Sequence, residues 1–271
     1  MSTSFLAAAL QLNSTLDRDE NLRCAERLVS QAADRGARLV VLPELFNCLG
    51  SPDAMLAEAE AIPGPSTAAA ASWGRKHEIV LVAGSIMERS PDGRAYNTST
   101  VFGPDGTLLA KYRKLHLFDV DLPGEVTYQE SRTVVPGDRS VVVETPLGRL
   151  GMSICYDLRF PELYRQLVDQ GAEVCLAPSA FTLPTGRDHW ELLVRARAVE
   201  NQFYMVAANQ WGRHGDALTT YGRSMIVDPW GVPLATAADG VGIITAAIDP
   251  QRTAKVRRRL PALEHRRQLS G

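Results

Sequence analysis

Cys155 occupies a position that suits a nucleophile. It follows the apolar run Leu150–Ile154 and precedes Pro161, a residue type favoured in the first turn of a helix, so we expect a tight strand-to-helix turn. The partial positive charge at a helix N-terminus would lower the pKa of such a thiol. The same turn would direct the Tyr156 backbone N–H at an oxyanion formed by attack from sulfur. The alternative is a buried structural cysteine.

Glu44 is the candidate general base. It comes directly after the apolar strand predicted at Leu39–Leu42 and after Pro43, which ends that strand. Ligands of open α/β sheets collect near the carboxyl ends of strands. Desolvation there favours the protonated carboxyl group, which suits proton abstraction. A helix-capping or solvent-exposed glutamate is an equally weighted alternative.

Lys114 ends a run in which three of four residues, from Lys111 onward, are cationic. Such a run is more often a solvent-exposed strand end than a site. A lysine near a reacting carbonyl can, however, stabilise a developing oxyanion.

The elements that must position these residues alternate along the chain. Strand patterns fall at 5–12, 39–42, 79–86, 98–102, 108–113, 140–144, 150–154, 174–177, 203–208, 224–227, 233–236 and 241–248, and helical patterns at about 18–34, 67–76, 161–169 and 188–201. Gly36 is the expected stop signal of the first helix. This alternation predicts a layered α/β protein and argues against an all-β sandwich or a helical bundle.

The composition excludes several classes of protein. The 271 residues are 45% hydrophobic and 22% charged, with a formal net charge of −2, so no global attraction to nucleic acid or acidic membranes is expected. The N-terminal apolar stretch is too short to span a membrane and lacks the features of a signal peptide. Four cysteines without a CxxC pair argue against disulfide and zinc scaffolds and favour a reducing, cytoplasmic setting. The sequence contains no glycine-rich phosphate-binding loop, which argues against a nucleotide-binding domain.

Three ordered segments resemble the Glu-Lys-Cys triad of the nitrilase superfamily of carbon–nitrogen hydrolases. They are Leu-Pro-Glu-Leu at Glu44, Tyr-Arg-Lys-Leu-His-Leu at Lys114 and Ile-Cys-Tyr-Asp-Leu-Arg-Phe-Pro-Glu at Cys155. The resemblance spans about Leu6 to Arg267. It implies a four-layer αββα sandwich formed by one domain, residues 1–271, with a C-terminal tail from about residue 250.

Further segments are similar to the Nit branch, which holds the deaminated glutathione amidases and the omega-amidases; they are residues 119–124, 128–131, 179–186, 189–191, 195–200 and 228–231. The resemblance implies that Glu130 is a second active-site glutamate, which helps to place the substrate or the attacking water. Asp188 and Arg223 depart from the branch pattern, which usually has a small residue and a histidine there. We expect both near the substrate entrance, where they would affect which amide is accepted.

The residues and the resemblance together imply hydrolysis of a small linear amide through a thioester on Cys155, with neither a metal nor an organic cofactor. The expected partners are the amide and water, without nucleic acid or membrane, and the resemblance implies a homodimer. Two alternatives stay open. One keeps the triad but hydrolyses a nitrile or an N-carbamoyl amine, and the other is a non-catalytic interaction protein on the same fold.

Substrate binding involves a second set of residues. Arg159 is the first candidate partner of a substrate carboxylate, with a structural ion pair as its alternative, and Phe181, Thr182 and Thr185 are expected to line the pocket. Cys24, Cys48 and Cys175 are expected to serve packing, although Cys48 is close in sequence to Glu44. His116 is expected to make a structural hydrogen bond. The basic run 255–259 is interpreted as a solvent-exposed helix or subunit contact.

Overall fold

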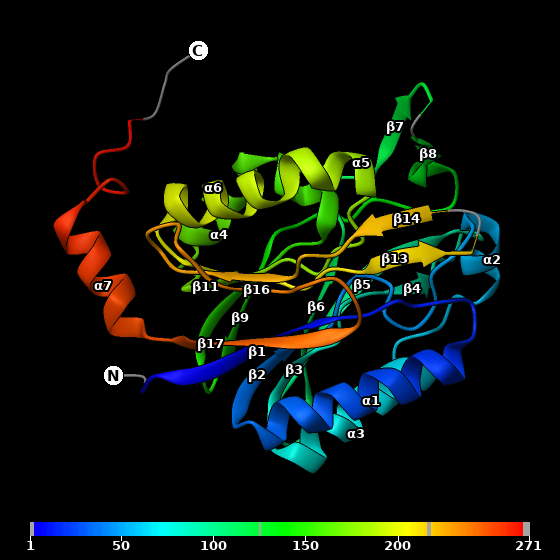
Figure 1. Ribbon diagram of the computed structural model, residues 1–271, viewed down its shortest axis with the longest axis horizontal. Coiled ribbons are helices and arrows are strands. Elements are labelled where there is room, and N and C mark those ends of the chain that lie inside the picture. Colours follow the sequence, from blue (N-terminus) through cyan, green and yellow to red (C-terminus); the bar gives the residue numbers. More distant parts are fainter. Residues whose placement is uncertain (1–2, 125, 216–217, 268–271) are drawn as a thin grey trace.

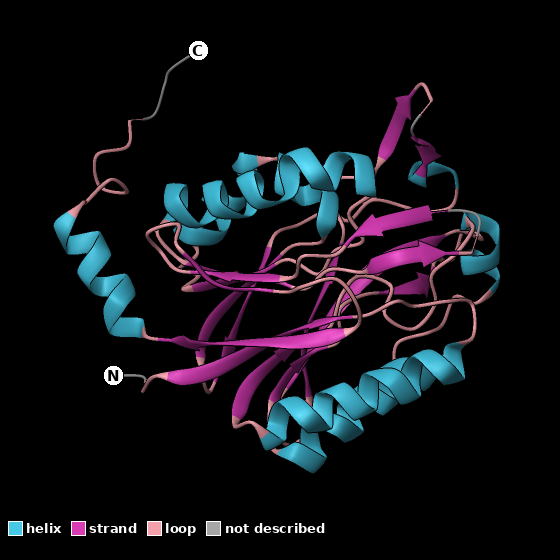
Figure 2. Ribbon diagram, viewed as in Figure 1, coloured by secondary structure: helices cyan, strands magenta, loops and turns pink. Residues whose placement is uncertain are grey.

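Two β-sheets pack face to face between two layers of helices in the computed structural model, which describes residues 3–124, 126–215 and 218–267 (Figures 1 and 2). The helices α1 (Arg18–Asp34) and α3 (Pro65–His77) cover one sheet, and α4 (Pro161–Asp169) and α6 (Glu191–Asn201) cover the other. The predicted αββα sandwich is therefore confirmed.

The first sheet contains seven strands in the described part of the chain. Its order is β17 (Gly242–Ile248), β1 (Phe5–Gln11), β2 (Ala37–Val41), β3 (Val80–Val82), β5 (Ala95–Phe102) and β4 (Ile86–Arg89), with β6 (Leu108–Arg113) also paired to β5. The second sheet has the order β16 (Pro233–Thr236), β15 (Met225–Val227), β12 (Tyr204–Ala207), β11 (Val174–Leu176), β10 (Gly148–Met152) and β9 (Val141–Thr145).

Short elements complete the described chain. They are the hairpins β7 (Asp119–Leu122)–β8 (Val126–Gln129) and β13 (Trp211–His214)–β14 (Leu218–Tyr221), the helices α2 (Pro52–Ala57), α5 (Leu183–Thr185) and α7 (Pro250–Arg259), the 3₁₀ helices η1 (Glu130–Arg132) and η2 (Cys155–Arg159), and a π-helical turn at Gly186–Trp190. Helix α7 begins directly after β17 and lies at one end of the sandwich (Figure 1), where Val256 is buried and Arg252 pairs with Asp228 at 2.9 Å.

The central strands β1 and β2 of the first sheet are apolar on both faces because both of their faces are buried. In β1, Ala7 and Ala9 belong to the core between the sheets, whereas Ala8 and Leu10 pack with α1 and α3. Strand β2 alternates in the same way. A sheet that is covered on both sides is expected to carry such continuous apolar runs.

Helix α1 shows why its boundaries were predictable. The Asp17 side chain accepts a hydrogen bond from the Glu20 backbone N–H at its N-terminus, and Gly36 adopts φ +86° just beyond its end. Ala25, Leu28 and Val29 lie at helical spacing on its buried face. The expected helix and its stop signal are both confirmed.

The strand predicted at 79–86 is wrong in its extent. The chain leaves β3 after Val82, turns at Gly84, which has φ +36°, and begins β4 at Ile86. The turn brings Gly84 against the Pro43 carbonyl and places the Ser85 hydroxyl where it accepts a hydrogen bond from the Leu45 N–H at 3.0 Å. Tertiary contacts at the end of β2, rather than local propensity, therefore divide this apolar run.

Glu88 joins the edge strands that lead to Lys114. Its buried carboxylate accepts hydrogen bonds from Thr98 at 2.7 Å, Lys111 at 2.8 Å and Arg113 at 2.9 Å. Burial alone would raise the pKa of Glu88, but the hydrogen bonds from Arg113, Lys111 and Thr98 lower it to about 2. This ion cluster ties β6 to β4 and β5, and Lys114 is the next residue after β6.

We expect Gly84→Ala to lower the free energy of unfolding more than Gly36→Ala does. At Gly36 an added Cβ would meet nothing within 4 Å, so the cost is backbone strain of about 1 to 2 kcal/mol. At Gly84 the Cβ would lie 1.8 Å from the Pro43 carbonyl oxygen, so the segment carrying Glu44 must also move. Urea denaturation of both variants measures the difference. Equal losses would contradict this account of the close approach.

Candidate active site

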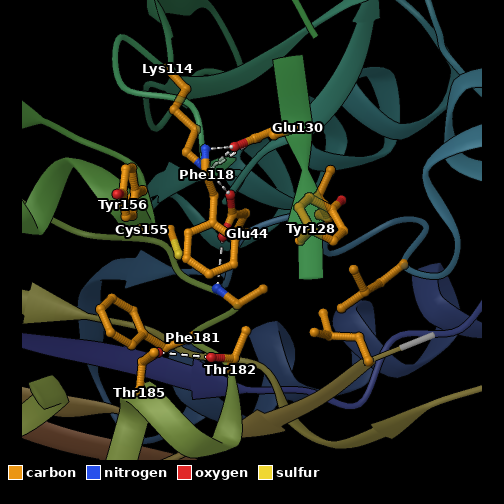
Figure 3. Close-up of a pocket in the computed structure, with 14 residues that line it drawn as sticks. Glu44, Lys114, Phe118, Tyr128, Glu130, Cys155, Tyr156, Phe181, Thr182 and Thr185 are labelled. Atoms are coloured by element: carbon orange, nitrogen blue, oxygen red, sulfur yellow. Dashed lines mark hydrogen bonds and ion pairs between the residues drawn. The ribbon is translucent and has the colours of Figure 1, made fainter. Parts of the chain in front are cut away.

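The four residues predicted to be catalytic meet in one pocket. Glu44 follows β2, Lys114 follows β6 and Cys155 follows β10, while Glu130 opens η1 directly after β8. The pocket encloses about 500 Å³, its open mouth included. In Figure 3, Lys114 and Glu130 lie at one end and Thr182 and Thr185 at the other, with Cys155 and Glu44 between them. Strand ends from both sheets thus converge here.

Lys114 lies between two carboxylates. Its Nζ donates to Glu44 Oε1 at 2.9 Å and to Glu130 Oε2 and Oε1 at 2.9 and 3.1 Å. All three side chains are buried. Burial alone would lower the pKa of Lys114, but the charges of Glu130 and Glu44 raise it well above its ordinary value. Lys114 therefore acts as a fixed positive charge, and the formal charges of the three groups leave one negative charge in excess.

Glu44 is held by three donors. Besides Lys114, the Asn97 Nδ2 donates to Oε1 at 2.8 Å and the Ala180 backbone N–H donates to Oε2 at 2.8 Å. The Gln210 side chain donates to the Glu44 carbonyl at 2.9 Å. Neither a capping role nor exposure to solvent describes this residue.

Cys155 lies on a strained turn. It has φ +46°, its N–H donates to the Pro178 carbonyl at 2.9 Å, and it is 8% exposed. A positive φ in a residue other than glycine stores strain and is found preferentially at functional sites. The structure thus places this thiol on an elbow at the edge of the pocket, as the sequence predicted.

The predicted lowering of the thiol pKa is wrong. Burial, and then the charge of Glu44, raise the pKa of Cys155 well above its ordinary value, while the charge of Lys114 opposes them. The residues that follow form only a short 3₁₀ helix, and α4 begins at Pro161. The dipole of a long helix therefore does not dominate at this sulfur.

Tyr156 is the second residue of η2, a position at which a backbone N–H has no partner within the turn. Its ring lines the pocket and contacts Phe118 edge-on, with the centroids 5.1 Å apart. Its N–H follows Cys155 directly in the chain, so the oxyanion role expected for it stays a prediction that this position allows.

Asn97 was missed by sequence reasoning. Its Nδ2 bridges Glu44 Oε1 at 2.8 Å and Glu130 Oε1 at 3.2 Å, and its carbonyl accepts from the Lys114 N–H at 2.9 Å. Asparagine is depleted in strands, so its presence in the middle of buried β5 was the available signal.

The pocket wall includes both expected and unexpected residues. Phe181, Thr182 and Thr185 line it as predicted, and the two threonine hydroxyls are 2.8 Å apart. The lining residues that sequence reasoning missed are Leu45, Leu49, Phe118, Tyr128, Ala180 and Leu218. Three of them lie on or beside the hairpins β7–β8 and β13–β14, which were not predicted.

Arg159 is not among the residues that line the pocket, but it lies next to two that are. Its guanidinium carbon is 5.6 Å from the centroid of the Tyr156 ring and 5.4 Å from that of Phe181, both of which line the pocket. Its two terminal nitrogens are each 3.3 Å from His189 Nδ1. No carboxylate pairs with Arg159 within the described residues, so the structural ion pair considered as its alternative is not found there.

Asp188 and Arg223 are not among the residues that line the pocket, and their expected place near the substrate entrance stays a prediction. Asp188 is exposed. Arg223 pairs with Asp239 at 3.0 Å, and its carbonyl accepts from the Trp190 indole at 2.7 Å. Both departures from the branch pattern therefore lie outside the pocket wall.

The residues for which we expected only structural roles are placed accordingly. Cys48 is buried outside the pocket lining, and burial raises its pKa to about 11. Cys175 lies in buried β11, and His116 Nδ1 is 2.7 Å from Asp157 Oδ1, the structural hydrogen bond that we expected.

Within the described residues, no helix combines the length and apolar character needed to span a bilayer. No cluster of three or more histidine, cysteine, aspartate or glutamate side chains suited to a metal ion occurs among the same residues.

Comparison with known proteins agrees with this geometry. The family model described as carbon-nitrogen hydrolase matches residues 6–258. A deaminated glutathione amidase of Synechocystis is 45% identical over 266 residues, covering 97% of this chain and 98% of the relative. The human omega-amidase NIT2 is 42% identical over 265 residues, covering 98% and 96%.

A solved structure shows the same fold. The crystal structure of the C. elegans NitFhit protein superimposes with a TM-score of 0.92 at 39% identity, over 98% of this chain and 66% of that one. The fold, the buried pocket and these similarities lead to one conclusion. The chain belongs to the carbon–nitrogen hydrolase family, in the Nit branch of the nitrilase superfamily, and is an enzyme of the amidase class.

Proposed function

We propose that this protein hydrolyses the terminal amide of a small linear substrate to a carboxylic acid and ammonia, through a thioester on Cys155. The observation that carries the proposal is the buried contact between Glu44 and Lys114 at 2.9 Å beside the Cys155 thiol, which shares their pocket. The three groups supply a base, a fixed positive charge and a nucleophile within one water-restricted space.

In the first step Glu44 takes the proton of Cys155. The thiol has a raised pKa, so it is protonated at rest and needs this base. The transfer moves a negative charge from the carboxylate to the sulfur without creating a new one, and the total charge of the pocket is unchanged. Lys114 favours the thiolate, because its charge lowers the pKa of Cys155.

In the second step the thiolate attacks the amide carbonyl carbon. The resulting oxyanion is stabilised by the Tyr156 N–H and by the charge of Lys114, and one positioned oxyanion donor is worth roughly 3 kcal/mol. The C–N bond breaks as Glu44 returns its proton to the leaving nitrogen. Ammonia departs and the acyl group stays on sulfur.

In the third step water cleaves the thioester. Glu44 again accepts a proton, now from water, whose oxygen bonds to the carbonyl carbon. The C–S bond then breaks as Glu44 returns this proton to sulfur, which releases the acid and restores the thiol. We propose that Glu130 helps to place the substrate or this water. Its position supports that role, because it lines the pocket while its two oxygens hold Lys114.

The favoured substrates are deaminated glutathione and related α-keto acid ω-amides, the class suggested by the names of the amidase relatives. The pocket offers apolar walls at Leu45, Leu49 and Leu218, which fit an aliphatic chain. Arg159, beside the rings of Tyr156 and Phe181, provides a cation for the carboxylate at the other end of such an amide. Phe181, Thr182 and Thr185 would bind the chain between the two ends.

We further propose that one domain spans residues 1–271, that the protein forms a homodimer and that it acts in the cytoplasm. Leu192 and Val199, one helical face of α6, are 67% and 50% exposed, and Trp230 is 51% exposed. These apolar side chains support an interface with a second copy. A nucleophilic thiol requires a compartment in which it stays reduced.

Ammonia release from four compounds tests the proposed function. Purified protein is incubated with deaminated glutathione, α-ketoglutaramate, a nitrile and an N-carbamoyl amino acid. We expect ammonia from the first two, and none of it from the Cys155→Ala variant. Turnover confined to the nitrile or the carbamoyl compound would reassign the substrate, and full activity in Cys155→Ala would refute the nucleophile. Activity with none of the four would favour a non-catalytic role.

Arg159→Met tests the carboxylate-binding role. We expect KM for an acidic amide to rise by about tenfold or more, because a hydrogen bond between charged groups is worth about 1.5 to 3 kcal/mol, while KM for a neutral amide of similar length changes little. Arg159→Lys keeps the charge, so its KM for the acidic amide is expected to lie between those of the unaltered enzyme and Arg159→Met. Arg139→Met, at an exposed position that does not line the pocket, is the control. An unchanged KM for the acidic amide in Arg159→Met would reject the role.

A further inference from the structure

Asp157 is a fully buried carboxylate that the proposed mechanism does not use. It lies two residues after Cys155, has no exposed surface and does not line the pocket. A buried charge is costly unless hydrogen bonds compensate it. The hydrogen-bond partners of Asp157 therefore indicate which segments this buried carboxylate holds together.

Four donors surround the Asp157 carboxylate. Oδ2 accepts from the Ile154 backbone N–H at 2.8 Å and from the Tyr112 hydroxyl at 2.7 Å. Oδ1 accepts from the His116 backbone N–H at 3.1 Å and lies 2.7 Å from His116 Nδ1, which therefore carries the hydrogen. An ionised carboxylate is an acceptor only, so four donors match it without leaving an unpaired proton.

These donors flank the two groups that must react together. Ile154 immediately precedes Cys155, while Tyr112 and His116 lie two residues on either side of Lys114. Lys114 follows β6 of the first sheet and Cys155 follows β10 of the second. The Asp157 carboxylate thus joins the ends of strands from opposite sheets, on either side of the pocket.

The donors are themselves held in place. Burial, and then the charge of Asp157, raise the pKa of Tyr112 well above its ordinary value, so the phenol stays protonated and donates. The His116 ring stacks on Phe160, with centroids 3.7 Å apart and planes inclined by 7°. The carboxylate is therefore satisfied, and its donors are packed in place.

We propose that Asp157 is a positioning residue that sets the placement of the Cys155 thiol relative to Lys114 and Glu44. This inference rests on the proposed function. Displacements of about 1 Å in such a site can cost about 10²-fold in rate. Loss of the Asp157 contacts lowers kcat, whereas KM changes little because most of the pocket wall, including Leu49, Thr182 and Leu218, belongs to other segments of the chain.

The test uses Asp157→Asn, with kcat and KM measured on whichever amide of the four-compound set is turned over fastest. The amide side chain has the shape of the carboxylate but turns an NH₂ group toward donors. We expect kcat to fall by about 10²-fold, with KM within threefold of the unaltered enzyme. Leu28→Ala, on the buried face of α1 and outside the pocket lining, is the stability control. It lowers the melting temperature but leaves kcat of the folded enzyme unchanged.

Tyr112→Phe keeps the inference testable if Asp157→Asn does not fold. It removes one of the four hydrogen bonds, and we expect kcat about tenfold lower with KM unchanged. The inference is overturned if a folded Asp157→Asn keeps kcat within twofold, or if Tyr112→Phe does so when Asp157→Asn is unfolded. It is also overturned if either variant raises KM instead of lowering kcat.

Cys155→Ala, assayed beside these variants, separates this inference from the proposed function. Turnover that survives in Cys155→Ala refutes the proposed function itself. An inactive Cys155→Ala beside a fully active Asp157→Asn refutes the positioning role alone.

Discussion

The structure of the site depends on one buried ammonium group between two carboxylates. Lys114 Nζ contacts Glu44 and Glu130 within 3.1 Å, and all three side chains are removed from water. Removing one partner of such a group leaves an uncompensated buried charge. The arrangement therefore fixes three chain segments at once. Its excess negative charge also suits a site in which a proton passes to Glu44 while the total charge stays constant.

The two-sheet architecture explains how these segments meet. Glu44 and Lys114 follow strands of the first sheet, and Cys155 follows a strand of the second. Both faces of β2 are buried, so the strand end that leads to Glu44 is held by packing on two sides. Asp157 then bridges the two sheets by hydrogen bonds at the pocket itself. Reacting groups held in this way need little reorganisation when substrate binds.

Sequence reasoning succeeded where local pattern and tertiary structure agree. The apolar runs before Glu44 and Cys155 predicted strand ends, and the capped periodicity of α1 predicted a helix. It failed where distant contacts decide. The hydrogen bonds of Asn97 to Glu44 and Glu130 join residues 53 and 33 positions apart, and the raised pKa of Cys155 arises from burial and from Glu44. Neither is visible in a local stretch of sequence.

The central claim is that groups from both sheets transfer the acyl group of the substrate to Cys155. Its most direct test is how the resulting thioester partitions between water and hydroxylamine. An amide and a methyl ester of the same acid are hydrolysed at one fixed concentration of hydroxylamine. Both substrates would form the same thioester. The account therefore predicts the same ratio of hydroxamate to acid from each of them. A ratio that differs between the two leaving groups would contradict a common acyl-enzyme.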